Sequence, residues 1–137
     1  MSDEDEFLPT AHPAFAAHFR DPIYENLSDD SAPFGSDEAF DEVSEWLDRG
    51  VTPDLTLPAM LAESFGPGFD VAELDFDEEP LALITIALGF LLLRVNGQLD
   101  TEGRAAVFGA LDWCTKNFGP GATNFNLVKG DLESFPH

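Results

Sequence analysis

The side chains best suited to chemistry are carboxylates that gather in one short segment of the chain. Asp29, Asp30 and Asp37 fall within nine residues, and Asp41 follows Asp37 by about one helical turn. Carboxylate oxygens are the ligands that Ca²⁺ and Mg²⁺ prefer, and His12 could complete such a set. One hypothesis is therefore a divalent-metal site that serves an enzyme or a metal sensor.

The spacing of these residues does not match the calcium-binding loop of an EF-hand. In a count that starts at Asp30, Gly35 takes the sixth position and Asp41 the twelfth, as such a loop requires. However, Ala32 and Phe34 fall on positions that must supply oxygen ligands. The sequence therefore predicts no bound cofactor and assigns no residue as a metal ligand.

The same segment also has a structural explanation. Pro33 and Gly35 favour a tight turn, with Phe34 between them as an anchor in the core. Ser36 can then supply the N-cap of a helix, and the carboxylate of Asp37 is favourable at the positive N-terminus of that helix. We favour the turn, and the metal site stays open as the alternative.

No other group of residues resembles a catalytic centre. His12 and His18 are six residues apart, so they do not share a helical face, and no HExxH-like pattern accompanies them. Gly66-Pro67-Gly68 lacks the lysine that follows in a phosphate-binding loop. Cys114 is the only cysteine, so neither an internal disulfide nor a thiolate zinc cluster can form, and we expect it to be buried. We predict no catalytic residue.

The net charge of −21 is concentrated in one part of the chain. The first 80 residues hold 22 Asp or Glu against Arg20 and Arg49, whereas residues 81–137 are close to neutral. Crowded like charges repel unless they stay solvated or meet a positive partner, so we expect an exposed acidic patch. DNA and anionic membranes are unsuitable partners, because binding either requires clustered Lys and Arg. The predicted partner-binding residues are Asp29, Asp30, Asp37, Asp41, Glu42 and Glu45.

An amphipathic helix over residues 37–49 should carry most of this patch. Phe40, Val43 and Leu47 recur at helical spacing and predict its inner face. The opposite side is acidic, which predicts that it faces solvent.

A shorter helix should follow over residues 57–65, capped by Thr56 and ended by Gly66. We expect Phe65 to lie on its inner face, together with Leu57 and Leu61.

The core should be an antiparallel helical hairpin with arms at about 78–95 and 101–117. Asn96-Gly97 ends the first arm, and Asp100 or Thr101 caps the second. The apolar run over residues 81–93 is shorter than the roughly 20 residues that a transmembrane helix needs. We therefore predict a mostly α fold in which this run is a buried core helix.

One domain should extend over residues 7–137, after a disordered acidic stretch at residues 1–6. An acidic start is the opposite of a secretory signal, so we expect a cytoplasmic protein. Residues 70–79 fit either a helical turn or a short strand. Beyond Gly119, the tail should turn at Lys129-Gly130-Asp131 and fold over the hairpin.

Several of these motifs together indicate a family. They are His12-Pro13 with Phe15, Asp29-Asp30, Pro33-Phe34-Gly35-Ser36-Asp37, Asp41, Trp46-Leu47 and Asn96-Gly97-Gln98-Leu99-Asp100. In them the chain resembles the YfeS-like group of small bacterial proteins over most of its length, although that family usually has a glycine where Ala39 stands. The resemblance implies a compact bacterial cytoplasmic protein. Because the family has no established activity, it implies no catalytic residue.

The composition and the motifs lead to two functional hypotheses. We expect a non-enzymatic interaction protein whose acidic surface binds a basic protein, in its sharpest form an immunity protein that neutralises a toxin. The alternative is the metal-dependent enzyme or sensor that would use Asp29, Asp30, Asp37 and Asp41. Acidity that serves solubility alone, or adaptation to high salt, is the simplest competing explanation of the charge. The sequence does not define the oligomeric state.

Overall fold

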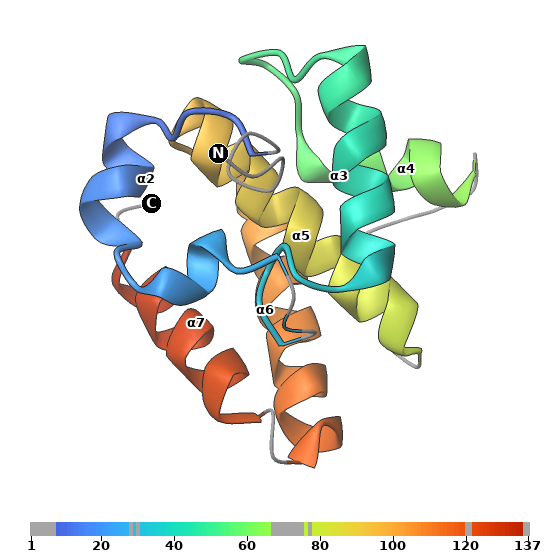
Figure 1. Cartoon of the computed structure of the whole chain (residues 1–137). Coiled ribbons are helices and arrows are strands. Elements are labelled where there is room, and N and C mark those ends of the chain that lie inside the picture. The colour runs from blue at the N-terminus through green and yellow to red at the C-terminus, as the bar shows by residue number, and fades with distance from the viewer. Residues whose placement is uncertain are drawn as a thin grey trace.

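α5 (Glu79–Asn96) is the central helix of the fold, and most of the other helices contact it (Figure 1). The computed structural model of the chain describes residues 8–27, 29, 31–66, 76, 78–119 and 122–135. Every residue of α5 from Ala82 to Arg94 is buried, as expected for a helix that is apolar on all sides. The described residues form a mostly α-helical, compact domain, as the sequence predicts.

The length and composition of α5 also satisfy the test for a membrane-spanning helix. It has 18 residues with a mean hydropathy of 1.6, and so extends beyond the apolar run that the sequence shows. Within the protein, however, 72% of this segment is buried against its neighbours. The burial confirms the predicted core helix.

α6 (Thr101–Asn117) follows α5 after a short turn and completes the predicted antiparallel hairpin. In that turn Gly97 has a φ of +71°, a left-handed conformation that glycine adopts without strain. The two helices approach closely at Gly89, where a Cβ atom would lie 2.4 Å from Cγ2 of Val107. Glycine at this position therefore permits the contact between the two arms.

The bounds of the hairpin match the prediction to within one residue. The second arm begins at Thr101 as expected, with Asp100 as its cap. The first arm begins at Glu79, after Glu78 as an N-cap without a side-chain hydrogen bond, and ends at Asn96, before the left-handed Gly97.

α3 (Asp37–Arg49) packs on α5 and has the predicted bounds. The hydroxyl of Ser36 caps it by accepting a hydrogen bond from the backbone nitrogen of Ala39 at 3.1 Å. Its buried residues are Ala39, Val43 and Trp46. The expectation that Phe40 faces the core is wrong, because its side chain is 41% exposed. Burial of the large Trp46 rotates the inner face by about one position.

α4 (Leu57–Phe65) contacts both α5 and α6, and its bounds are also as predicted. Thr56 caps it through a hydrogen bond from the nitrogen of Ala59 to its hydroxyl. Leu57 and Leu61 are buried as expected, but Phe65 is 42% exposed. Phe65 is the last residue of the helix, where the chain already turns away.

α7 (Ala122–Ser134) packs along α6. The expected turn at Lys129-Gly130-Asp131 is wrong, because these residues lie within the helix. Phe125, Val128 and Leu132 are spaced at helical intervals and all three are buried. Their packing overrides the weak helix propensity of Gly130 and Asp131.

The N-terminal segment holds two short helices, α2 (Pro13–His18) and η1 (Pro22–Glu25). It brings Phe15 and Tyr24 into the core, where both are almost fully buried. Residues 1–6, for which disorder is predicted, lie outside the described residues. Residues 70–75 also lie outside the described residues, so the choice between a helical turn and a short strand for the segment 70–79 stays open.

Candidate acidic interaction surface

Six acidic residues of α3 form the surface that we call the acidic face. Five of them are exposed, and Glu42 is half-buried because its carboxylate accepts a hydrogen bond from the hydroxyl of Ser64 at 2.9 Å. The acidic face consists of Asp37, Glu38, Asp41, Glu42, Glu45 and Asp48. Four of the six predicted partner-binding residues therefore share one helix.

The carboxylates of the acidic face are not neutralised by ion pairs with described residues. Arg49, the only basic residue of α3, pairs with Glu63 of α4 and lies 4.3 Å from the ring centroid of Trp46. Within the part of the chain that the structure describes, none of the six acids forms an ion pair. Neighbouring carboxylates one turn apart, such as Asp41 and Glu45, therefore repel each other with no ion pair to offset the repulsion.

Asp29 has a structural environment that differs from that of the acidic face. Its Oδ1 accepts hydrogen bonds from the hydroxyl of Ser31 at 2.6 Å and from the nitrogen of Ser31 at 2.9 Å. These two bonds hold the pKa of the Asp29 carboxyl below its usual value. Asp30, the other acid predicted here, lies outside the described residues.

Residues 31–36 form a tight turn that packs against Asp29, and this turn contains the predicted Pro33-Phe34-Gly35. A Cβ atom on Gly35 would lie 1.9 Å from the carbonyl oxygen of Asp29, so the chain can approach itself only at glycine. Phe34 is almost fully buried, and Ser31 accepts a hydrogen bond from Asn124 of α7 at 2.7 Å. The turn positions the first residue of the acidic face.

The described residues contain no set of side chains that could ligate a metal ion. No three side chains of His, Cys, Asp or Glu in that part of the chain come together in a suitable group. Nδ1 of His12 accepts a hydrogen bond from the nitrogen of Ala14 at 3.0 Å, and the backbone nitrogen of His12 donates to the carbonyl of Arg94 at 2.7 Å. His12 thus caps α2 at the end of α5, where Arg94 lies in the last turn.

His18 also has a structural role. Its Nε2 lies 2.7 Å from the carbonyl oxygen of Asp131 and 3.0 Å from the hydroxyl of Ser134, at the C-terminal end of α7. Since a carbonyl oxygen can only accept, Nε2 donates to Asp131. The histidine therefore satisfies a carbonyl of the last helical turn.

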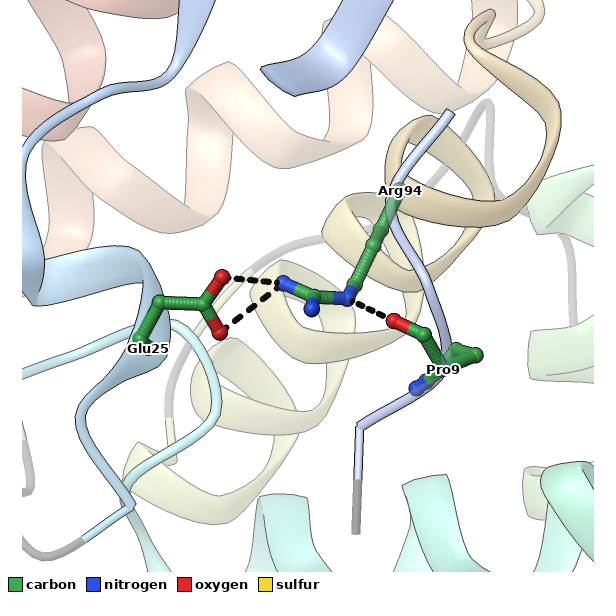
Figure 2. Close-up of polar contacts among 3 residues, drawn as sticks. All are labelled: Pro9, Glu25 and Arg94. Carbon is green, nitrogen blue, oxygen red and sulfur yellow. Dashed lines mark hydrogen bonds and ion pairs between the residues drawn. The ribbon is translucent and has the colours of Figure 1, made fainter. Parts of the chain in front are cut away.

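Arg94 is a buried cation that sequence analysis missed. Figure 2 shows that its Nε donates to the carbonyl oxygen of Pro9 at 2.6 Å and that its Nη1 lies 2.9 Å from Oε1 of Glu25. The arginine side chain is only 8% exposed, whereas that of Glu25 is 61% exposed. An arginine at the end of a uniformly apolar helix was the available signal, but its partners come from a distant segment.

One hollow among the described residues lies between the end of α7 and the turn that joins α5 to α6. It has a volume of about 210 Å³, and its charged lining residues are Asp100 and Arg104. Asp100 accepts hydrogen bonds from backbone nitrogens, and Arg104 donates to the carbonyl of Leu132 at 2.8 Å. Both groups are thus committed to the fold, and the hollow offers no candidate acid or base.

Comparison with known proteins identifies one similar curated protein. No family model matches the chain. No solved structure matches it. It is 29% identical to the protein named "Uncharacterized protein YfeS" from Escherichia coli (strain K12), in an alignment that covers 98% of this chain and 67% of that protein. The resemblance seen in the sequence motifs thus extends over nearly the whole chain, which is similar to this YfeS protein.

Proposed function

We propose that this chain is a non-enzymatic interaction protein that binds a basic protein partner through the acidic face of α3. The observation that carries the proposal is the set of six acids on one helix, five of them exposed, with no ion pair to any described residue. Asp29 and Asp30 precede the same helix and stay within the proposed binding region as predictions.

The physical basis of the proposed binding is the electrostatic repulsion between neighbouring carboxylates of the acidic face. Like charges one helical turn apart cost about 0.2 to 0.5 kcal/mol per pair. A partner with clustered Lys and Arg relieves this repulsion on binding, and the long-range field speeds the encounter. Residues 81–137 are close to neutral and offer no comparable concentration of negative charge.

The sharper form of the proposal is an immunity-type protein that neutralises a cationic toxin in the cytoplasm. Fast electrostatic capture needs a small, acidic, preorganised surface and no chemical step. The described cavity supports a non-enzymatic role, since its charged groups are engaged in capping and in helix contacts.

A low-salt capture experiment separates partner binding from acidity that serves only solubility. The face variant carries Asp37→Asn, Asp41→Asn and Glu45→Gln. The matched control variant carries Asp54→Asn, Glu102→Gln and Glu133→Gln, which remove the same number of negative charges from other exposed positions. Each protein is immobilised and exposed to the native host's lysate at low ionic strength.

The proposal predicts that wild type and the control variant capture a basic protein from the lysate and that added salt elutes it. The face variant should not capture this protein. Equal capture by the two variants would show that only the total charge matters. Capture of nothing basic by any of the three proteins would leave solubility as the explanation of the charge.

A further inference from the structure

The N-terminal strap, which we define as residues 8–27, lies on the side of the molecule formed by α5 and α7 (Figure 1). Its aromatic side chains contact both helices. The ring of Phe19 lies 5.4 Å from that of Phe90 on α5 and 5.2 Å from that of Phe135, which follows α7. The ring of Tyr24 stacks on Phe90 at 5.7 Å. The strap therefore covers an aromatic surface that would otherwise face water.

The polar anchors of the strap gather at two places. At the end of α5, Arg94 holds the carbonyl of Pro9 and the carboxylate of Glu25. At the end of α7, the hydroxyl of Tyr24 donates to Oδ2 of Asp131 at 2.6 Å, and His18 bonds to the backbone of that same residue. Tyr24 and Glu25 are adjacent in η1, so one helical turn reaches both anchor points.

The helices beneath the strap pack on one another without it. α5 contacts α3, α4 and α6, and α7 contacts α6. α2 has its principal helix contact with α5. Detachment of the strap therefore withdraws Phe15 and Tyr24 from the core but leaves the helix contacts between the hairpin and its main neighbours in place.

Water can replace the anchor of the strap at Arg94. The Glu25 side chain is 61% exposed and Arg94 lies in the last turn of α5, so both groups can be hydrated as soon as they separate. Elements with solvent-accessible hydrogen bonds and few contacts open at a lower free energy than the core does.

We propose that the strap is a separately opening unit, held by Arg94 and Asp131, whose detachment uncovers the aromatic surface of Phe90 and Phe135 while α5, α6 and α7 stay folded. The fold thus contains a cover over an apolar surface. This inference concerns the side of α5 and α7 and does not depend on the acidic face.

Native-state hydrogen exchange on the full chain tests the proposal. In wild type, amides of residues 13–25 should exchange at least about tenfold faster than amides of residues 107–111 in α6, since local openings lie well below global unfolding in free energy. Their exchange should also depend less on added denaturant, because a local opening exposes less surface.

Two substitutions test the anchors directly. Tyr24→Phe together with Glu25→Gln removes one bond at each anchor point and should accelerate exchange in the strap by a further factor of about ten or more. Exchange in α6 should not change. Glu45→Gln, on the acidic face, is the control and should alter neither region.

Equal rates and equal denaturant dependence in the strap and in α6 of wild type would overturn the proposal. So would an anchor variant in which both regions accelerate by the same factor, since the strap would then open only when the whole domain unfolds. The wild-type measurement keeps the test valid even if the double variant folds poorly.

Discussion

The carboxylate of Asp100 accepts a hydrogen bond from the backbone nitrogen of Leu57, with 2.9 Å between oxygen and nitrogen. Leu57 is the first residue of α4, and the other carboxylate oxygen accepts from the nitrogen of Gly103 in the first turn of α6 at 2.8 Å. One side chain thus serves the N-termini of two helices, whose exposed N–H groups favour negative charge. Asp100 thereby fixes α4 against the core hairpin.

Replacing Asp100 by alanine should therefore cost more than the loss of an ordinary cap. Asp100→Ala leaves two backbone donors unsatisfied, and we expect the free energy of unfolding to fall by about 2 to 3 kcal/mol. Asp100→Asn keeps one acceptor oxygen and should lose less. Urea unfolding measures both variants, with Asp54→Ala as the surface control. A change below about 0.5 kcal/mol in Asp100→Ala would contradict the double cap.

Two glycine-to-alanine substitutions should have opposite effects on stability. Gly35→Ala places a Cβ atom against the carbonyl of Asp29 and should destabilise the protein by about 1 to 3 kcal/mol or more. Gly130→Ala lies in α7, where the new Cβ meets no side chain or neighbouring element within 4 Å, and should stabilise the protein by about 1 kcal/mol. Thermal unfolding distinguishes them, and a shift of both melting temperatures in the same direction would contradict the packing described.

The buried thiol of Cys114 should be inert in the folded protein. Burial, with a further contribution from the charge of Glu79, raises the thiol pKa to about 12. Since the thiolate is the reactive form, a disulfide reagent at pH 8 should label Cys114 only after urea unfolds the chain. Rapid labelling of the native protein at that pH would show that the thiol of Cys114 is accessible to the reagent and not buried.

The same shift predicts lower stability at high pH. The pKa of Cys114 is raised in the folded state, so its contribution is complete below the unfolded value of about 8.5 and is lost as the pH rises toward 12. Burial and the bond to Asp131 raise the pKa of Tyr24 too, which adds a loss above about pH 10. Cys114→Ala should show a flatter alkaline decline in unfolding free energy than wild type. An equal alkaline decline of the unfolding free energy in Cys114→Ala and wild type would contradict the raised pKa of Cys114.

Divalent cations should not bind at a specific site of the described acidic residues, because no three ligands converge there. At millimolar Mg²⁺, Mn²⁺ or Ca²⁺, we expect the melting temperature to equal that in NaCl of the same ionic strength, which controls for screening. A larger rise with one cation, abolished by Asp37→Asn with Asp41→Asn, would instead support the metal-dependent alternative.

The features that sequence analysis could predict are those with local causes. Caps at Ser36, Thr56 and Asp100 set the starts of three helices, and the bounds of α3, α4 and α6 followed from them. The exposure of Phe40 depends instead on how α3 rotates to bury Trp46, which no local signal fixes. The same holds for the bond between Arg94 and Glu25, whose partners lie 69 residues apart.

The candidate site also combines features with local causes and features that depend on tertiary contacts. An acidic outer side of helix 37–49 follows from periodicity alone, and the exposure of Asp37, Asp41 and Glu45 agrees with it. The position of Asp29 in a packed turn did not follow, since it depends on contacts with Ser31 and Gly35. Helical periodicity thus predicts which acids of residues 37–49 face outward, whereas tertiary packing decides the environment of Asp29 in the preceding turn.

The most direct test of the acidic face is the salt dependence of affinity for the captured basic partner, measured with wild type, the face variant and the control variant. Wild type and the control variant should bind equally, and their affinity should fall steeply with ionic strength. The face variant should bind at least about tenfold more weakly at low salt, with a shallower slope. Equal affinities for the two variants, or an affinity that salt does not change, would contradict a binding role for the acidic face of α3.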